Sequence, residues 1–161
     1  MREKHMSTEE NKALARLWFA EGWNKGNVSV ADGIFSPHLT LNGVEVGPEG
    51  PKQNVLQTRE GFPDITFSLE DQIAEADLVV TRWIARGTHL GELKALPPTG
   101  KTVVVPGIVI WRVVGGRVFA DHTVSGEATL LQQLTAFSDD LPRRLDDLRG
   151  QTAGLGPRPQ D

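Results

Sequence analysis

Asp121 and His122 are adjacent ionisable residues in a segment of mostly apolar neighbours, which makes them the first candidates for proton-transfer chemistry. The segment has the composition of a β-strand, and neighbouring strand residues point to opposite faces. Only one of the two side chains can therefore face an interior. Alternation groups Asp121 with Phe119 and Thr123, and His122 with Val118, without deciding which group faces inward. Both residues could instead be rim residues at a sheet edge.

His89, Asn42 and the tryptophans are further candidates, and each has a second interpretation without chemistry. His89 opens a loop at a strand end, where it could cap a pocket mouth or be solvated. Asn42 ends a short strand before Gly43, a position typical of a plain turn residue. Tryptophans on strands and helices usually pack in a core. These residues therefore mark places to inspect and do not by themselves define a site.

Other catalytic motifs fail on spacing. The segment 99–102 (Thr-Gly-Lys-Thr) ends like a phosphate-binding loop, but Ala95 occupies the position where that motif requires glycine. Ser125 lacks the glycines of a nucleophile elbow, so a serine hydrolase is not predicted. No paired spacing typical of metal ligands occurs among His38, His89 and His122. The sequence therefore predicts no metal site from spacing, which leaves only clustering in space as a way to form one.

The composition excludes several classes of protein. The chain of 161 residues has no Cys and no Tyr, so thiol chemistry and a phenolic oxyanion donor are both ruled out. The net charge is −4, with no basic run that could neutralise phosphates, so no nucleic-acid partner is predicted. Apolar stretches are far shorter than the roughly 20 residues of a membrane helix, and the first residues lack the apolar region of a secretory signal. We expect a cytoplasmic protein with no membrane partner.

The first half of the chain is predicted to be helical. Ser7 followed by Glu10 is the pattern of a capping box, and apolar residues recur at helical spacing until Gly22. A short second helix is expected around 30–35, followed by a short strand at 38–42. Pro51 is suited to the first turn of a third helix, which Pro63 ends.

The second half changes to a period of two. Four strands are predicted, and a last helix is expected to follow them, in the ranges 65–75, 78–88, 102–113, 117–126 and 127–137. We predict an α+β fold in which a curved antiparallel sheet wraps the N-terminal helices as a cone, or α+β barrel, with an apolar pocket. This domain would span 7–137, between a disordered leader (1–6) and a flexible tail (138–161). The outer sheet face can pack on a second copy, so a homodimer is expected.

The order of these elements and several short phrases resemble one family. The phrases are Asn11-Lys12-Ala13-Leu14, Trp23-Asn24-Lys25-Gly26-Asn27, Gly47-Pro48-Glu49-Gly50, Phe62-Pro63-Asp64, Pro97-Pro98-Thr99-Gly100-Lys101 and Gly107-Ile108-Val109-Ile110-Trp111-Arg112. Because they recur in order over residues 8 to 130, the chain is similar to the SnoaL-like polyketide cyclases. The resemblance implies the nuclear-transport-factor-like α+β cone, which agrees with the fold predicted above.

The resemblance also implies an activity. In the cyclase members, a carboxylate on the last strand closes an aromatic polyketide by intramolecular aldol addition, without metal or organic cofactor. Asp121 is the matching residue here, because a carboxylate in an apolar pocket has its pKa raised and can take and return a proton. His89 and Asn42 are candidates for hydrogen-bonding the enolate oxygen. The expected substrate-binding residues are Trp83, Trp111, Phe119, His122, Val109 and Phe35.

The chain departs from many relatives at Asn42, Val109 and the Asp121-His122 pair, where those relatives have more polar residues or a His-Trp pair. The family also includes relatives assigned to hydroxylation in anthracycline biosynthesis, so a hydroxylase of the same fold is an alternative. A ketosteroid isomerase would need a Tyr donor that the chain lacks. An epoxide hydrolase would need an Asp-Arg-Asp network, of which the sequence shows only scattered pieces, so both are distant alternatives. A non-catalytic module that binds a small molecule is an alternative from another class.

Overall fold

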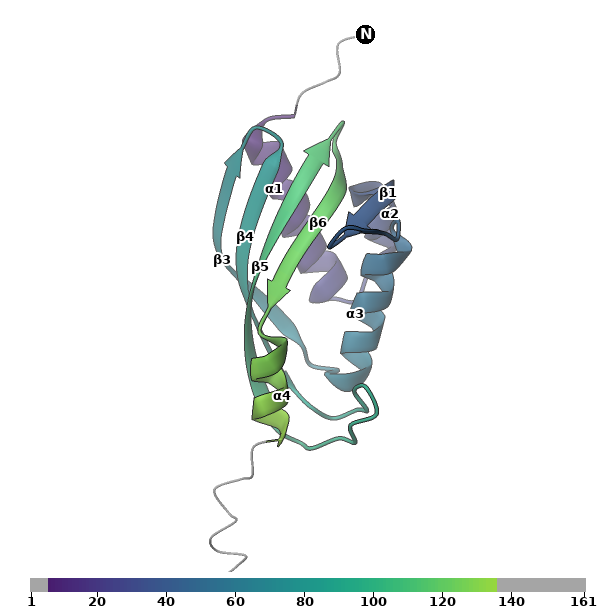
Figure 1. Ribbon diagram of the computed structural model, residues 1–161, viewed down its shortest axis with the longest axis vertical. Coiled ribbons are helices and arrows are strands. Elements are labelled where there is room, and N and C mark those ends of the chain that lie inside the picture. Colours follow the sequence, from purple (N-terminus) through teal and green to yellow (C-terminus); the bar gives the residue numbers. More distant parts are fainter. Residues whose placement is uncertain (1–5, 136–161) are drawn as a thin grey trace, which may run out of the picture.

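The computed structural model describes residues 6–135, so almost all of the expected leader and the whole expected tail lie outside the described residues. The chain forms helices on one side of a six-stranded sheet (Figure 1). The helical elements are α1 (Thr8–Leu17), η1 (Trp18–Trp23), η2 (Val28–Val30), α2 (Ala31–Ile34), α3 (Glu49–Gly61) and α4 (Glu127–Thr135). The strands are β1 (Phe35–Leu41), β2 (Val44–Glu45), β3 (Thr66–Glu75), β4 (Leu78–Thr88), β5 (Thr102–Val114) and β6 (Arg117–Ser125).

The start of α1 is fixed by a reciprocal cap, as the sequence predicts. The Ser7 hydroxyl accepts from the Glu10 amide at 3.2 Å, and the Glu10 carboxylate accepts from the Ser7 amide at 2.7 Å. The helix then widens into the π-helical segment η1, where Trp18 lies against Gly22. A Cβ at Gly22 would come within 2.4 Å of the Trp18 ring, so only glycine fits there. This packing turns Trp18 inward.

The sheet has the order β2-β1-β6-β5-β4-β3. It is curved, as Figure 1 shows, and it is unclosed because its two edge strands do not pair with each other. The four long strands of the second half are confirmed as an antiparallel run. The predicted curved sheet is present, and it contains one parallel pair, β1 with β6, beside its antiparallel pairs. The first strand also begins earlier than predicted, at Phe35. Pro37 is tolerated there because the β1–β6 register shifts between Phe35 and Thr40, and proline has no amide for the ladder.

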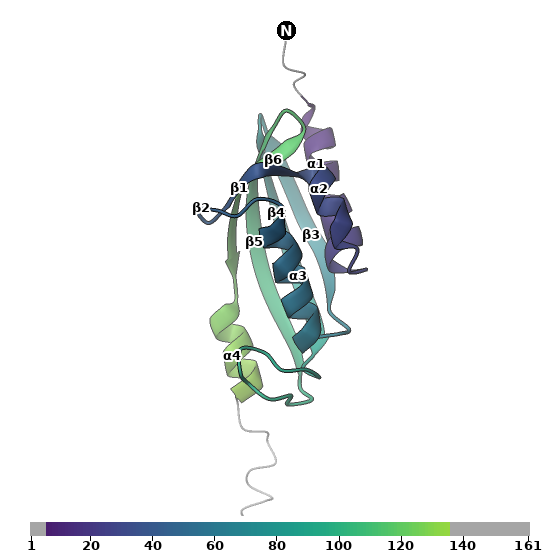
Figure 2. The ribbon, with the colours of Figure 1, turned by 90° about the vertical axis from the view of Figure 1, so that its right-hand side faces the viewer.

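The concave face of the sheet faces the helices. Along β5, buried and exposed residues alternate through the whole strand, and Val109 and Trp111 are among those that face inward. Figure 2 shows α3 and α1 lying on this face of the sheet. The guanidinium of Arg59 fastens α3 to the end of η1 by donating to the Trp23 carbonyl at 2.9 Å. The fold therefore places a helical layer over one face of a curved sheet and leaves space between them.

Candidate active site

Asp121 lies in the middle of β6, opposite Trp111 of β5. Simple alternation would put Asp121 and Val118 on opposite faces, and this expectation was wrong. The register between β5 and β6 shifts at Phe119, a bulge that resets the alternation, so that buried Val118 and half-buried Asp121 share the concave side. The bulge turns Phe119 outward with 40% of its surface exposed.

Two donors hold the Asp121 carboxylate. The indole N–H of Trp111 donates to Oδ2 at 2.8 Å, and the hydroxyl of Thr123 donates to Oδ1 at 2.6 Å. Burial raises the pKa of Asp121 above its usual value, while the two hydrogen bonds and the nearby His122 act in the opposite direction. Asp121 is thus a desolvated carboxyl group with a raised proton affinity and a fixed orientation.

Asn42 lies beside Asp121 across the β1–β6 pair. Asn42 and Gly43 both have positive φ, +47° and +87°, as in a two-residue hairpin turn between β1 and β2. The Asn42 amide donates to the Asp121 carbonyl at 2.8 Å, and its side-chain Oδ1 accepts from the Thr123 amide at 2.9 Å. These two bonds fix the side chain, so its NH₂ group is the part left free for a ligand. Asn42 has the turn role and also lines the cavity.

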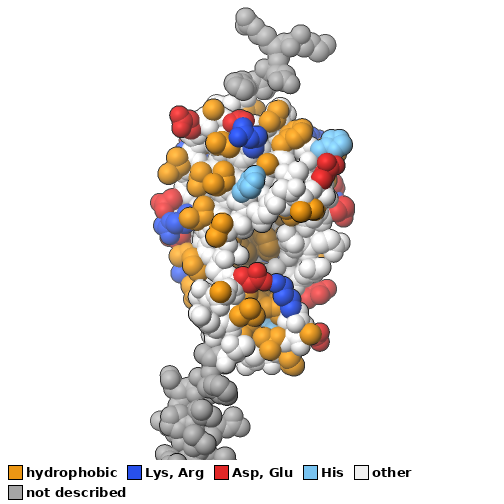
Figure 3. Space-filling view, viewed as in Figure 1, with side chains coloured by type: hydrophobic (Ala, Val, Ile, Leu, Met, Phe, Trp, Pro, Cys, Tyr) orange, Lys and Arg blue, Asp and Glu red, His pale blue; other side chains and the backbone are white. Residues whose placement is uncertain are grey.

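A cavity of about 1170 Å³ lies between the sheet and the helices. Figure 3 shows a hollow between α3 and the junction of β6 with α4. Asp121, Asn42, Trp83, Trp111 and Val109 all line the cavity, so the structure brings these five expected site residues together. This volume is slightly larger than the roughly 300–1,000 Å³ that is typical of small-molecule sites.

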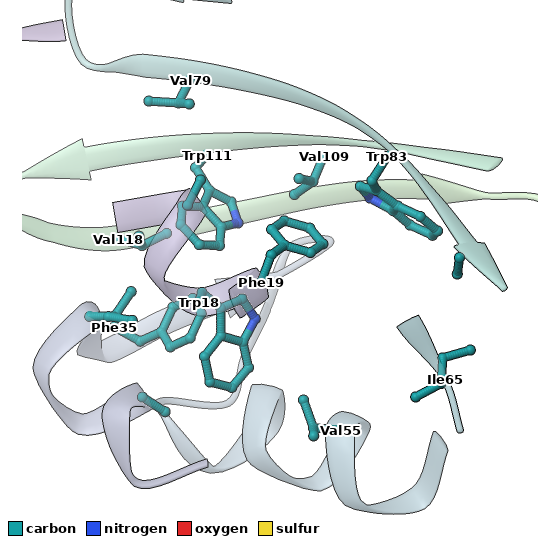
Figure 4. Packing of buried hydrophobic residues seen from close by; sticks show 14 of the residues in the cluster. Trp18, Phe19, Phe35, Val55, Ile65, Val79, Trp83, Val109, Trp111 and Val118 are labelled. Carbon is teal, nitrogen blue, oxygen red and sulfur yellow. The ribbon is translucent and has the colours of Figure 1, made fainter. Parts of the chain in front are cut away.

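Aromatic side chains form the sheet-side wall. Figure 4 shows Trp83, Val109 and Trp111 extending from the strands toward the helical layer. A Cβ at Gly107 would lie 2.1 Å from the Trp83 ring, so the glycine on the neighbouring strand makes room for that indole. The Phe67 ring contacts Trp83 at a tilt of 56°, with ring centroids 5.0 Å apart, and the side chain of Asn24 bonds both backbone groups of Phe67. All four tryptophans of the chain line the cavity.

Three of the residues expected to bind substrate are absent from the cavity lining. Phe35 is fully buried behind it, where its ring meets Trp111 edge-on at 5.4 Å and supports that indole. Phe119 is turned outward by the bulge, and His122 pairs with Ile110 on the outer face of the sheet. These placements do not favour direct contact between the three residues and a ligand in this cavity.

His89 lies at the opposite end of the inner face from Asp121. Asp121 is level with Trp111 and Val79, and His89 follows Val79 by ten residues, about 30 Å of extended chain. The ring is fully buried but does not line the cavity. Nδ1 accepts from the Thr99 amide at 3.2 Å, and Nε2 has no partner among residues 6–135. This placement does not favour the expected contact with an enolate oxygen near Asp121.

Sequence reasoning did not assign a role to Thr123, although its alternation with Asp121 was visible. It also did not single out the polar residues of α3 that line the cavity, Asn54, Gln57 and Thr58. Their spacing along a helix predicted to cover a core was the signal that could have found them. Within residues 6–135 no group of three or more His, Asp or Glu side chains could hold a metal ion. None of the helices described is long and apolar enough to cross a membrane.

The sequence profile of the SnoaL-like polyketide cyclase family matches residues 13–134. A search among curated proteins finds no match. Among solved structures, a protein from Acidithiobacillus ferrooxidans, provisionally named a polyketide cyclase, is 27% identical, with a TM-score of 0.71. The alignment covers 80% of this chain and 97% of that one.

Two proteins from Streptomyces are also similar. IdmH from Streptomyces antibioticus, provisionally named a polyketide cyclase, is 28% identical with a TM-score of 0.69, over 77% of this chain and 97% of that one. AclR from Streptomyces galilaeus, provisionally named a hydroxylase, is 27% identical with a TM-score of 0.71, over 92% of this chain and 96% of that one. Relatives of this fold therefore carry names from two reaction classes.

Proposed function

The chain belongs to the SnoaL-like polyketide cyclase family, and on that premise we propose that it closes a ring in an aromatic polyketide ester by intramolecular aldol addition. The observation that supports this proposal is the position of Asp121, a desolvated carboxyl group that opens onto an aromatic-walled cavity and is held by two donors. A carboxyl group with a raised pKa can accept a proton from carbon and later return it.

The proposed reaction moves one proton, which Asp121 first removes from the substrate and later returns to it. The Asp121 carboxylate removes a proton from a carbon flanked by two carbonyl groups, which leaves an enolate. The enolate carbon forms a new carbon–carbon bond to a ketone carbon of the same molecule, and the electrons of that carbonyl move to its oxygen. The Asp121 carboxyl group then returns the proton to this oxygen. The product is an isomer of the substrate, so the step consumes no oxidant and no co-reactant.

Asn42 is the proposed donor to the oxygen that becomes negative. Its Oδ1 is already engaged with the Thr123 amide at 2.9 Å, so the NH₂ group is available beside Asp121. A fixed donor aimed at a developing negative charge lowers the barrier more than a mobile one. Trp83, Trp111 and Val109 would hold the flexible chain folded, so that the reacting carbons meet.

The test is mass spectrometry of incubations with an anthraquinone polyketide ester, with wild type compared to Asp121→Asn. The proposal expects an isomeric product from the wild type that is missing with the variant. Equal turnover by Asp121→Asn would contradict the mechanism. Tight binding of the ester without any conversion would instead favour a module that only binds.

A hydroxylase is the second candidate, and the extensive match to AclR favours it, since that alignment covers 92% of this chain. The balanced reaction would insert one oxygen atom of dioxygen into a carbon–hydrogen bond, while a two-electron reductant converts the other atom to water. The same incubation with labelled dioxygen and a reductant separates the two candidates. A product heavier by one labelled oxygen would mean hydroxylation.

A homodimer through the outer face of the sheet is the proposed assembly. Ile108 and Val124 are register partners on β5 and β6, and they are 45% and 76% exposed. Ile110, next along β5 on the same face, is 40% exposed. Apolar side chains grouped on a sheet face are typical of an interface. Light scattering of the wild type and of Ile110→Asp tests this, since only the variant should be monomeric. The cytoplasmic location stays a prediction.

A further inference from the structure

The cavity has a second polar region, away from Asp121, on the helix that covers it. Gln57 and Thr58 follow Asn54 on α3 by three and four residues, so the three side chains share one side of the helix. All three line the cavity. The buried stripe of the same helix is apolar, with Val55 fully buried. Uncharged polar residues therefore line the cavity beside the buried stripe of α3, and the side chains of Asn54 and Gln57 are open to solvent there.

The side chains of these three residues are not used by the fold. Within residues 6–135, no hydrogen bond or ion pair involves the side chain of Asn54, Gln57 or Thr58. Two amides elsewhere in the chain are engaged, that of Asn24 with the Phe67 backbone and that of Gln72 with the Thr81 hydroxyl. An amide offers both donors and an acceptor, so it can bond either a carbonyl or a hydroxyl group.

The opposite wall of the cavity is aromatic. Phe67 contacts Trp23 and Trp83 with ring centroids 4.6 and 5.0 Å apart, and Phe19 lies 5.6 Å from Phe67. Figure 4 shows Trp83 and Phe19 between the strands and the helical layer that carries Val55. A cavity with one aromatic wall and one amide wall fits a flat, unsaturated ligand with oxygen atoms along one edge.

The charged residues around the cavity indicate that the oxygen-bearing edge of the ligand is itself uncharged. Lys94 is the one cationic side chain among the described lining residues, and it is paired with Glu127. The remaining charged lining residues are acidic, namely Glu60, Glu92 and Asp121. A carboxylate or phosphate on the ligand would therefore meet repulsion and no free cation. Neutral ketone, phenol or ester oxygens would meet the amides without that cost.

We propose that Asn54, Gln57 and Thr58 form a specificity subsite that hydrogen-bonds the oxygenated edge of a flat aromatic substrate, opposite the aromatic wall. This inference rests on the proposed function, because it takes an aromatic molecule as the ligand. It adds the residues that select a hydroxylated ring system over a bare hydrocarbon and that set which edge of the molecule faces α3.

The tryptophans provide a direct assay. The chain has no tyrosine, and its four tryptophans all line the cavity, so quenching of the intrinsic fluorescence reports ligand binding. The probes are 1,8-dihydroxyanthraquinone and anthracene, which are similar in shape but differ in oxygen atoms. Gln57→Leu removes an amide that lines the cavity. Gln53→Leu is the matched control, because Gln53 is exposed on the same helix, as Gln57 is, but does not line the cavity.

We expect Gln57→Leu to weaken binding of the dihydroxyanthraquinone roughly fivefold to tenfold, the loss of about one hydrogen bond, and to leave anthracene binding unchanged. Gln53→Leu should change neither. Asn54→Leu gives a second, independent test if Gln57→Leu folds poorly. Wild type that does not prefer the oxygenated probe, or variants that weaken both probes equally, would overturn the subsite.

The measurement is independent of turnover. Selective binding together with full activity of Asp121→Asn would overturn the proposed chemistry and keep the subsite. An isomeric product that depends on Asp121, together with equal effects of Gln57→Leu on both probes, would keep the proposed chemistry and overturn the subsite.

Discussion

The two ends of the inner sheet face each carry an ionisable residue, half-buried Asp121 at one end and fully buried His89 at the other. The two residues differ in access to the cavity and in the partners of their polar atoms. Asp121 opens onto the cavity, and its two carboxylate oxygens accept hydrogen bonds from the side chains of Trp111 and Thr123. His89 is sealed under its loop, with Nδ1 turned to the Thr99 amide and Nε2 without a partner among residues 6–135. Burial marks both residues, but only access to the cavity makes one of them a candidate for chemistry.

The largest expected effect separates the two ends by turnover. Asp121→Asn keeps the shape of the side chain and removes the group that holds the proton, so we expect kcat to fall about 10²- to 10⁴-fold. His89→Gln should change kcat by less than about threefold, equivalent to under 1 kcal/mol in the barrier. Steady-state kinetics on the folded fraction of each variant measures this. Equal losses in the two variants would contradict the distinction between the ends.

The effect on stability should be the opposite of the effect on turnover, with the larger loss at the His89 end. His89→Ala leaves a hole in a fully buried position, so we expect the free energy of unfolding to fall by about 2 kcal/mol. The exposed His122 is the matched control, and His122→Ala should stay within about 0.5 kcal/mol of the wild type. Urea denaturation followed by tryptophan fluorescence measures both. A His89→Ala protein as stable as the control would show that the loop does not depend on this ring.

A smaller effect concerns the pH at which Asp121 acts. The Trp111 N–H stabilises the carboxylate form, so Trp111→Phe should raise the pKa of Asp121 further and move the rising limb of the kcat/KM profile to higher pH. Thr123→Val removes the second donor and should shift the profile in the same direction. Trp83→Phe is the control, because Trp83 lines the cavity and makes no hydrogen bond to Asp121. Identical profiles for Trp111→Phe and Trp83→Phe would exclude this role of the indole.

The smallest expected effect is a difference in how stability depends on pH. Burial raises the pKa of Asp121, so the folded state holds its proton above pH 3.8, where the unfolded chain releases it, and stability falls as pH rises through that window. At the His89 end, the Thr88 amide and hydroxyl lower the pKa of Asp64, so its contribution is lost as pH falls below 3.8.

Two variants measure this difference. As pH rises above 3.8, Asp121→Asn should gain stability relative to the wild type. Asp64→Asn should be less stable than the wild type above that pH, and the two should converge as the medium becomes more acidic. Denaturation at a series of pH values from about 3 to 7 tests both signs. If the stability of both variants relative to the wild type changed with pH in the same direction, one of the two carboxyl environments would be misassigned.

The sequence by itself determined the local elements. The Ser7–Glu10 cap, the strands of the second half and the Asn42-Gly43 turn were all visible, because hydrogen bonds and periodicity within a few residues decide them. The resemblance to a family extended this to the fold and to Asp121 as a candidate. These features depend on residue types and spacing, which the sequence contains.

Only the tertiary structure decided which candidates meet. The bulge at Phe119 is set by pairing with β5, and it reverses the alternation that assigned Phe119 to the side of Asp121. The parallel pairing of β1 with β6 brings Asn42 to Asp121 across about eighty residues of chain, while the run of β4 carries His89 to the far end. The amide wall of α3 became visible only once the helix had a cavity to face. Register and layer packing are non-local, so no pattern within a short segment contains them.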